Sequence, residues 1–103
     1  MNILSQLFGA STKVDLQQII NEGAFLVDVR TPGEFASGHV KGSENIPLNN
    51  ITSLLNKFKN KKNIIVFCQS GGRSSQAKTI LEQNGFVNVI NGGTWNNVNQ
   101  FVK

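Results

Sequence analysis

The stretch that decides the fold is Asn63-Ile64-Ile65-Val66-Phe67, which leads directly into Cys68-Gln69-Ser70-Gly71-Gly72-Arg73-Ser74. A short continuous run of β-branched and aromatic residues predicts a strand that is covered on both faces. The glycines and serines after it predict a tight loop, and a helix over 74–84 follows with Gly85 as its C-cap. The only cysteine of the chain therefore lies at the carboxyl end of a buried strand.

Helices and strands alternate through the rest of the sequence. We expect the following elements in order: a helix with Thr12 as N-cap and Gly23 as its stop, a strand over 24–29, a helix from the capping box at Thr31 to near Gly38, an extended piece over 43–47, a helix capped by Asn50 with Ile51, Leu54, Leu55 and Phe58 inward, a strand over 86–90, a turn over 91–93, and a last helix capped by Thr94. Short helical crossovers imply parallel strands with helices on both faces of the sheet. The expected fold class is α/β in three layers.

The length of 103 residues suits one domain, which we place at 12–103 after a short amphipathic lead-in over 1–11. A single cysteine allows no disulfide within the monomer and fits a reducing compartment. The sequence contains no apolar run long enough to span a membrane. We therefore expect a cytoplasmic protein with no membrane partner.

The net charge of +4 is partly concentrated in four lysines, Lys57, Lys59, Lys61 and Lys62. A nucleic-acid patch is one interpretation. The other is that these lysines complement the dipole of a helix C-terminus and solvate that end. We favour the second, because no aromatic residues are interleaved with the basic ones and no zinc or helix-turn-helix spacing is present.

The loop over 68–74 carries the chemistry. Gly71 and Gly72 allow backbone angles that turn N–H groups toward one centre, and the following helix N-terminus adds its positive dipole. Arg73 adds a cation, so the loop can hold an anion and favour the Cys68 thiolate. An inert buried cysteine is the alternative. Ser74 either donates to the bound anion or serves only as the helix N-cap, and these two roles stay open.

In this loop the chain resembles the single-domain rhodaneses, a family of sulfurtransferases. The loop matches the pattern Cys-x-Ser-Gly-x-Arg-Ser at each fixed position. Four further segments match in order and spacing: Asp28-Val29-Arg30-Thr31-Pro32 with Glu34-Phe35, Gly38-His39-Val40-Lys41-Gly42-Ser43, Asn45-Ile46-Pro47-Leu48, and Gly92-Gly93-Thr94-Trp95 after Gly85-Phe86. The resemblance covers about residues 12–100, and it implies a rhodanese-like fold with about five strands in a mostly parallel sheet.

The resemblance implies a persulfide mechanism without a cofactor. Cys68 would take a sulfane sulfur from thiosulfate, or from another persulfide donor, and pass it to a thiol or cyanide. The substrate loop would consist of Gln69, Ser70, Gly71, Gly72, Arg73 and Ser74. Arg73 would bind the sulfonate of thiosulfate or brace the loop. Asp28 and Arg30 would form supporting ion pairs, and His39 would belong to the scaffold.

Three other functions compete with this one. A cysteine phosphatase uses a similar anion loop, but its loop carries five residues between cysteine and arginine, whereas this one carries four. A persulfide carrier, or a rhodanese-like module that binds a protein partner, would show little thiosulfate turnover. A disulfide oxidoreductase lacks its second cysteine here. With one cysteine and one histidine, an ordinary zinc site also lacks ligands, and we expect no metal.

Overall fold

A parallel sheet with strand order β2-β1-β3-β4 forms the centre of a computed structural model, which describes residues 15–103. Its strands are β1 (Phe25–Asp28), β2 (Glu44–Asn45), β3 (Ile64–Cys68) and β4 (Val89–Thr94). The predicted α/β class with parallel strands is confirmed. The described part of the chain holds four strands rather than about five, one for each extended segment predicted between residues 24 and 90. The lead-in over 1–11 lies outside the described residues.

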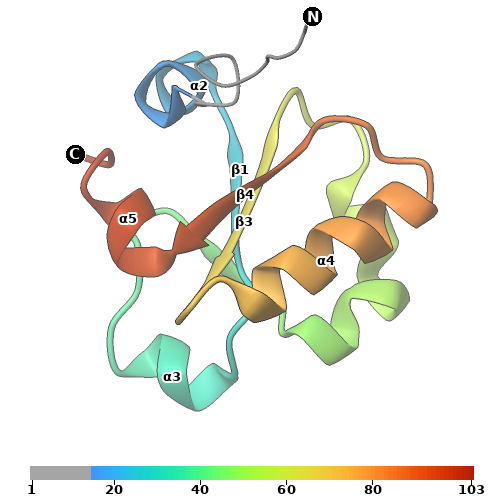
Figure 1. Cartoon of the computed structure of the whole chain (residues 1–103), viewed down its shortest axis with the longest axis horizontal. Helices are drawn as coiled ribbons and strands as arrows, with labels where there is room; N and C mark the ends of the chain where they lie inside the picture. Colours follow the sequence, from blue (N-terminus) through green and yellow to red (C-terminus); the bar gives the residue numbers. More distant parts are fainter. Residues whose placement is uncertain (1–14) are drawn as a thin grey trace, which may run out of the picture.

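Helices cover both faces of this sheet (Figure 1). The helices α2 (Leu16–Glu22) and α5 (Trp95–Asn99) pack on one face, and η2 (Leu48–Phe58) and α4 (Gly72–Gln83) pack on the other. The short helix α3 (Pro32–Ala36) follows the carboxyl end of β1. Among residues 15–103 we find no helix with the length and apolar character needed to cross a membrane.

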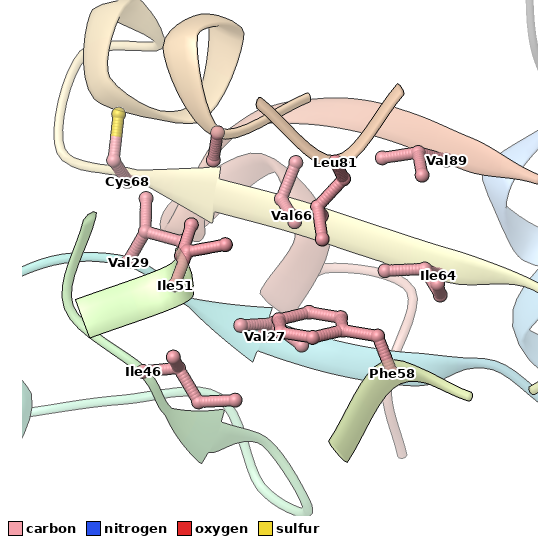
Figure 2. Packing of buried hydrophobic residues seen from close by; sticks show 11 residues of the cluster. Val27, Val29, Ile46, Ile51, Phe58, Ile64, Val66, Cys68, Leu81 and Val89 are labelled. Atoms are coloured by element: carbon pink, nitrogen blue, oxygen red, sulfur yellow. The ribbon is translucent and has the colours of Figure 1, made fainter. Parts of the chain in front are cut away.

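Strand β3 is the centre of the core, since all five of its residues are buried. Its side chains alternate between the two faces, as the period of a strand requires. Ile64, Val66 and Cys68 point to the side of η2 and α4, whereas Ile65 and Phe67 point to the side of α2 and α5. Figure 2 shows Cys68 at the tip of β3, with Val66 and Ile64 behind it on the same face. The cysteine is therefore both a core residue and the last residue of a strand.

The predicted ends of the first two helices are mostly correct. Gly23 ends α2 with a φ of 104°, but its N-cap is Asp15, whose carboxylate accepts from the N–H of Gln18 at 3.1 Å. The predicted cap, Thr12, lies outside the described residues. Thr31 and Glu34 form the predicted capping box of α3.

The predicted amphipathic α-helix over residues 50–58 is wrong in type. Element η2 is a 3-10 helix that begins after Pro47, without a side-chain cap from Asn50. Leu54 interrupts it with φ −125° and ψ 28°, and its side chain is 37% exposed, whereas Ile51 and Phe58 are buried. A 3-10 helix has three residues per turn, so apolar residues spaced for 3.6 do not all stay on the core side.

The last strand also differs from its prediction over 86–90. Strand β4 runs through the predicted turn at Gly92 and Gly93, because Val66 pairs with Asn91 and Phe67 pairs with Gly93, which leaves Gly92 as a bulge. A Cβ atom on Gly92 would lie 2.6 Å from Val98 Cγ2. The missing side chain thus lets β4 approach α5 closely. The predicted N-cap of α5, Thr94, is confirmed.

Candidate active site

The sulfur of Cys68 is enclosed by the start of helix α4. Its side chain is fully buried, and Sγ accepts from the backbone N–H of Gly71 at 3.0 Å and from that of Ser74 at 3.4 Å. Gly71 has a φ of 97°, a left-handed conformation that a glycine adopts without strain and that curls the loop back over the sulfur. Figure 2 shows the sulfur pointing toward this loop and the first turn of α4. Two amide donors and a helix N-terminus therefore converge on one sulfur atom.

This environment lowers the pKa of the Cys68 thiol. Burial acts first and raises the pKa, but hydrogen bonds from the loop, among them those of the backbone N–H groups of Ser74, Ser70 and Gly71, lower it by more. The net direction is below the ordinary value of a thiol. The loop thus favours an anion on the sulfur, in spite of its burial.

Ser74 does not cap helix α4. The N-cap is Gly71, and Ser74 is the third helical residue, because the left-handed Gly71 starts the helix earlier than the sequence pattern indicates. The buried Ser74 hydroxyl lies 3.5 Å from Cys68 Sγ, 3.0 Å from the carbonyl oxygen of Gly71 and 2.7 Å from Asn91 Oδ1. Of the two roles left open for Ser74, the helix cap is wrong, and donation to a bound anion stays a prediction.

Arg73 is bound by a carboxylate from another helix. Its Nη1 and Nη2 donate to the two oxygens of Glu34 at 2.8 and 3.0 Å, in a bidentate pair that joins α4 to α3. The hydrogen bonds from Arg73, followed by that from the N–H of Thr31, lower the pKa of Glu34 to about 2. Of the two roles predicted for Arg73, the structure contains the contact that braces the loop.

A cleft of about 320 Å³ opens beside this ion pair. Its lining residues are Val29, Thr31, Pro47, Leu48, Asn49 and Arg73. They come from the carboxyl ends of β1 and β2 and from the start of α4, which is the edge where parallel sheets bind ligands.

Asp28 and Arg30 form the predicted supporting ion pair at the end of β1. Arg30 donates through Nη2 to Asp28 Oδ2 at 2.7 Å and to the carbonyl oxygen of Gly38 at 2.7 Å. Its guanidinium also lies 4.8 Å from the ring centroid of Trp95. The pair is buried and ties the β1 loop to α3 and α5.

The comparisons with known proteins agree with this arrangement. The sequence profile of the rhodanese-like domain matches residues 12–96. The chain belongs to the rhodanese-like family. A sulfurtransferase of Allochromatium vinosum is 34% identical over 70 residues, which are 68% of this chain and 65% of that protein. The thiosulfate sulfurtransferase PspE of Escherichia coli is 38% identical over 69 residues, which are 65% of this chain and 66% of PspE.

Solved structures place the rhodanese-like chain in the same fold. The structure titled "rhodanese with anions from E. coli" superposes with a TM-score of 0.66 at 34% identity, over 73% of this chain and 91% of that one. The relatives named as sulfurtransferases support a role in sulfur transfer. The chain spans between 54% and 66% of the length of four curated relatives that it matches.

In the rhodanese-like loop, Ser70 acts on the sulfur through its backbone N–H and not through its side chain. The side chains of Gln69 and Ser70 are exposed, and His39 stacks on Phe35 with its Nδ1 2.8 Å from the carbonyl oxygen of that residue. Lysines of the predicted basic cluster contact other elements: Lys57 pairs with Glu44, and Lys61 lies over the ring of Phe25.

Two residues at the site were not predicted from the sequence. Glu34 was expected in a capping box and in a segment that matches the family, but no local signal links it to Arg73, which is 39 positions away. Asn91 was expected in a turn. Its position next to a glycine pair hides the strand pairing with Val66 that places it on the side of Ser74.

Proposed function

We propose that the protein is a sulfurtransferase that carries a sulfane sulfur as a persulfide on Cys68. The observation that carries this proposal is the pair of backbone N–H groups, from Gly71 and Ser74, that donate to Sγ at the positive end of α4. These donors stabilise a thiolate before reaction, and the positive end of α4 stabilises the persulfide anion afterwards. We propose that the transfer takes place in the cytoplasm, because a lone thiol suits a reducing compartment. We assign the activity to one domain over residues 12–103.

The proposed reaction is a displacement at sulfur in two steps. In the first step, Cys68–S⁻ attacks the outer sulfur of thiosulfate, a new S–S bond forms, and the bond to the sulfonate sulfur breaks to release sulfite. In the second step, cyanide or a thiolate attacks the outer sulfur of Cys68–S–S⁻ and leaves with it, which restores the thiolate. Charge balances in both steps, and no external oxidant or reductant is needed.

Thiosulfate is the proposed donor, in line with the name of the relative PspE. A carrier that receives its sulfur from a protein persulfide is the second candidate. The ion pair between Arg73 and Glu34 favours this candidate, because a guanidinium that already holds a carboxylate is less available to the sulfonate of thiosulfate. A small anionic donor and a protein donor are thus the two alternatives for the first step.

Intact-mass spectrometry tests the proposal. The reduced chain and the Cys68→Ser variant are incubated with thiosulfate, and circular dichroism verifies that both are folded. We expect the native chain alone to gain the mass of one sulfur atom and to lose it again on addition of cyanide.

The outcomes separate the candidates. Absence of the added sulfur on the folded, reduced native chain would exclude thiosulfate as donor. Loading only by a persulfidated protein would then identify a carrier. Hydrolysis of an aryl phosphate without any sulfur loading would identify a phosphatase instead.

A further inference from the structure

The hydroxyl of Ser74 has more hydrogen-bond acceptors around it than it has hydrogens. Its Oγ lies 2.7 Å from Asn91 Oδ1, 3.0 Å from the carbonyl oxygen of Gly71, and 3.5 Å from both the carbonyl oxygen of Gly93 and Cys68 Sγ. A serine hydroxyl carries one hydrogen, so it cannot serve all of these atoms at once. The direction of that hydrogen decides whether Ser74 donates a hydrogen bond to the sulfur or accepts one from it.

The side-chain amide of Asn91 settles this direction. The backbone N–H of Gly93 donates to Asn91 Oδ1 at 2.9 Å, and because an N–H group cannot accept, the atom that faces it is the amide oxygen. An amide oxygen has no hydrogen, so the 2.7 Å contact requires Ser74 to donate to Asn91. The Oγ atom of Ser74 can then accept a hydrogen bond from the S–H of Cys68, and this is the direction of the 3.5 Å contact between Sγ and Oγ.

The register of β4 on β3 explains why Asn91 is there. Asn91 pairs with Val66, and paired residues of parallel strands share a face of the sheet. Val66 belongs to the face that carries Cys68 and α4, so the side chain of Asn91 lies on the side of Ser74. The extra residue, Gly92, then brings the N–H of Gly93 back to the same amide oxygen.

We propose that Asn91 is a positioning residue for Cys68, which holds the hydroxyl hydrogen of Ser74 away from the sulfur and so favours an uncharged Sγ over the thiolate. The inner sulfur of a persulfide is also uncharged, since the charge lies on the outer sulfur. Asn91 therefore favours the loaded form as well. This last point rests on the proposed function, whereas the effect on the thiolate depends only on the contacts of Ser74.

The charged groups near the site do not explain an effect of Asn91 on the titration of Cys68. They are the ion pair of Arg73 on α4 with Glu34 on α3, and the ion pair of Asp28 and Arg30 at the end of β1. The residue that β4 presents to Ser74, Asn91, is neutral. Asn91→Ala leaves both pairs in place and adds no charge, so its effect on the titration of Cys68 can be assigned to the hydroxyl.

The test is the pH dependence of alkylation of the reduced full chain by iodoacetamide. Only the thiolate reacts, so the midpoint reports the pKa of Cys68, and restricted access of the reagent to the sulfur slows the reaction equally at every pH. We expect Asn91→Ala to lower the midpoint and to speed alkylation on its acid side about threefold, with the same plateau rate. We expect Asn91→Asp to raise the midpoint, because a carboxylate holds the hydrogen more firmly and repels the thiolate.

Two further comparisons make the test specific. The effect of Asn91→Ala must vanish in a Ser74→Ala background, since Asn91 acts through that hydroxyl. Asn97→Ala is the matched control, because the side chain of Asn97 anchors the same segment through the carbonyl oxygen of Gly92 but does not contact Ser74. We expect it to leave the midpoint unchanged.

Three results would overturn the inference: an Asn91→Ala profile that coincides with the native one, a shift in the same direction for Asn91→Ala and Asn91→Asp, or an equal shift without Ser74. Alkylation needs no sulfur donor. A chain that takes no sulfur from any donor, yet shows the expected midpoints, would therefore contradict the proposed function and leave the role of Asn91 intact.

Discussion

Replacing Asp28 by asparagine leaves the guanidinium of Arg30 buried without its counter-ion. Asp28 is 0% exposed and Arg30 is 3% exposed. The carboxylate accepts from the backbone N–H of Arg30 at 3.0 Å and from its Nε and Nη2 at 2.7–3.0 Å. Asparagine keeps the shape of the side chain, but it loses the charge and one of the two acceptor oxygens. The carbonyl oxygen of Gly38 still accepts from Arg30 without neutralising it.

We expect Asp28→Asn to lower the free energy of unfolding by about 3–5 kcal/mol, the usual cost of removing one partner from a buried ion pair. Since small domains are stable by only about 5–15 kcal/mol, this loss is a large part of the total. The double variant Asp28→Asn with Arg30→Met should recover part of the loss, because it removes the unpaired buried charge.

Urea unfolding followed by circular dichroism measures this change as a shift of the midpoint at constant slope. The matched control is Glu82→Gln, which breaks the exposed pair of Lys78 and Glu82 and should cost less than about 0.5 kcal/mol. A loss of less than about 1 kcal/mol for Asp28→Asn would refute the idea that this pair fixes the end of β1.

Three other predictions concern backbone space and titration. Gly92→Ala should destabilise the fold by about 1–3 kcal/mol or more, because the new Cβ would lie 2.6 Å from Val98 Cγ2. The Cβ of Gly33→Ala would have no atom within 4 Å, so this variant should stabilise helix α3 by about 0.5–1 kcal/mol. Urea unfolding measures both changes. The pKa of Glu34 is about 2 in the folded chain, against about 4.3 in an unfolded one, so its contribution to stability is present above pH ~4.3 and is lost as the pH falls toward 2. Glu34→Gln should therefore flatten acid unfolding in this window, and an unchanged acid profile would count against the ion pair. The pKa of Cys68 is lowered, so its alkylation midpoint in the native chain should lie below that of the same chain in denaturant; a higher native midpoint would contradict the amide contacts at Sγ.

The sequence predicted the features that depend on neighbouring residues. The apolar run of β3, the capping box at Thr31 and the loop around Gly71 each specify their own backbone, so a local pattern is sufficient to find them. Parallel strands then follow from the alternation with helices, and this places Cys68 at the ligand-binding edge of the sheet.

Two features were missed, one in the type of a helix and one in the course of a strand. The apolar spacing over 51–58 indicates an α-helix, but Pro47 starts a 3-10 turn and Leu54 breaks it. Only some of the apolar residues in this segment are therefore buried. Gly92 and Gly93 carry a turn signature, yet pairing with β3 keeps them in a strand. In β4, tertiary pairing thus overrides the local preference.

The role of Asn91 shows how far a loop motif alone can define a reactive cysteine. The residues from Cys68 to Ser74 supply the amide donors in any chain that shares their backbone, because those contacts lie within the loop. The hydrogen of the Ser74 hydroxyl is different, since its direction is decided by a side chain on β4, 17 positions later. Two chains with the same loop but different residues at the position of Asn91 would therefore differ in the pKa of the loop cysteine. The reactivity of Cys68 is thus a property of the loop together with the bulged strand beside it.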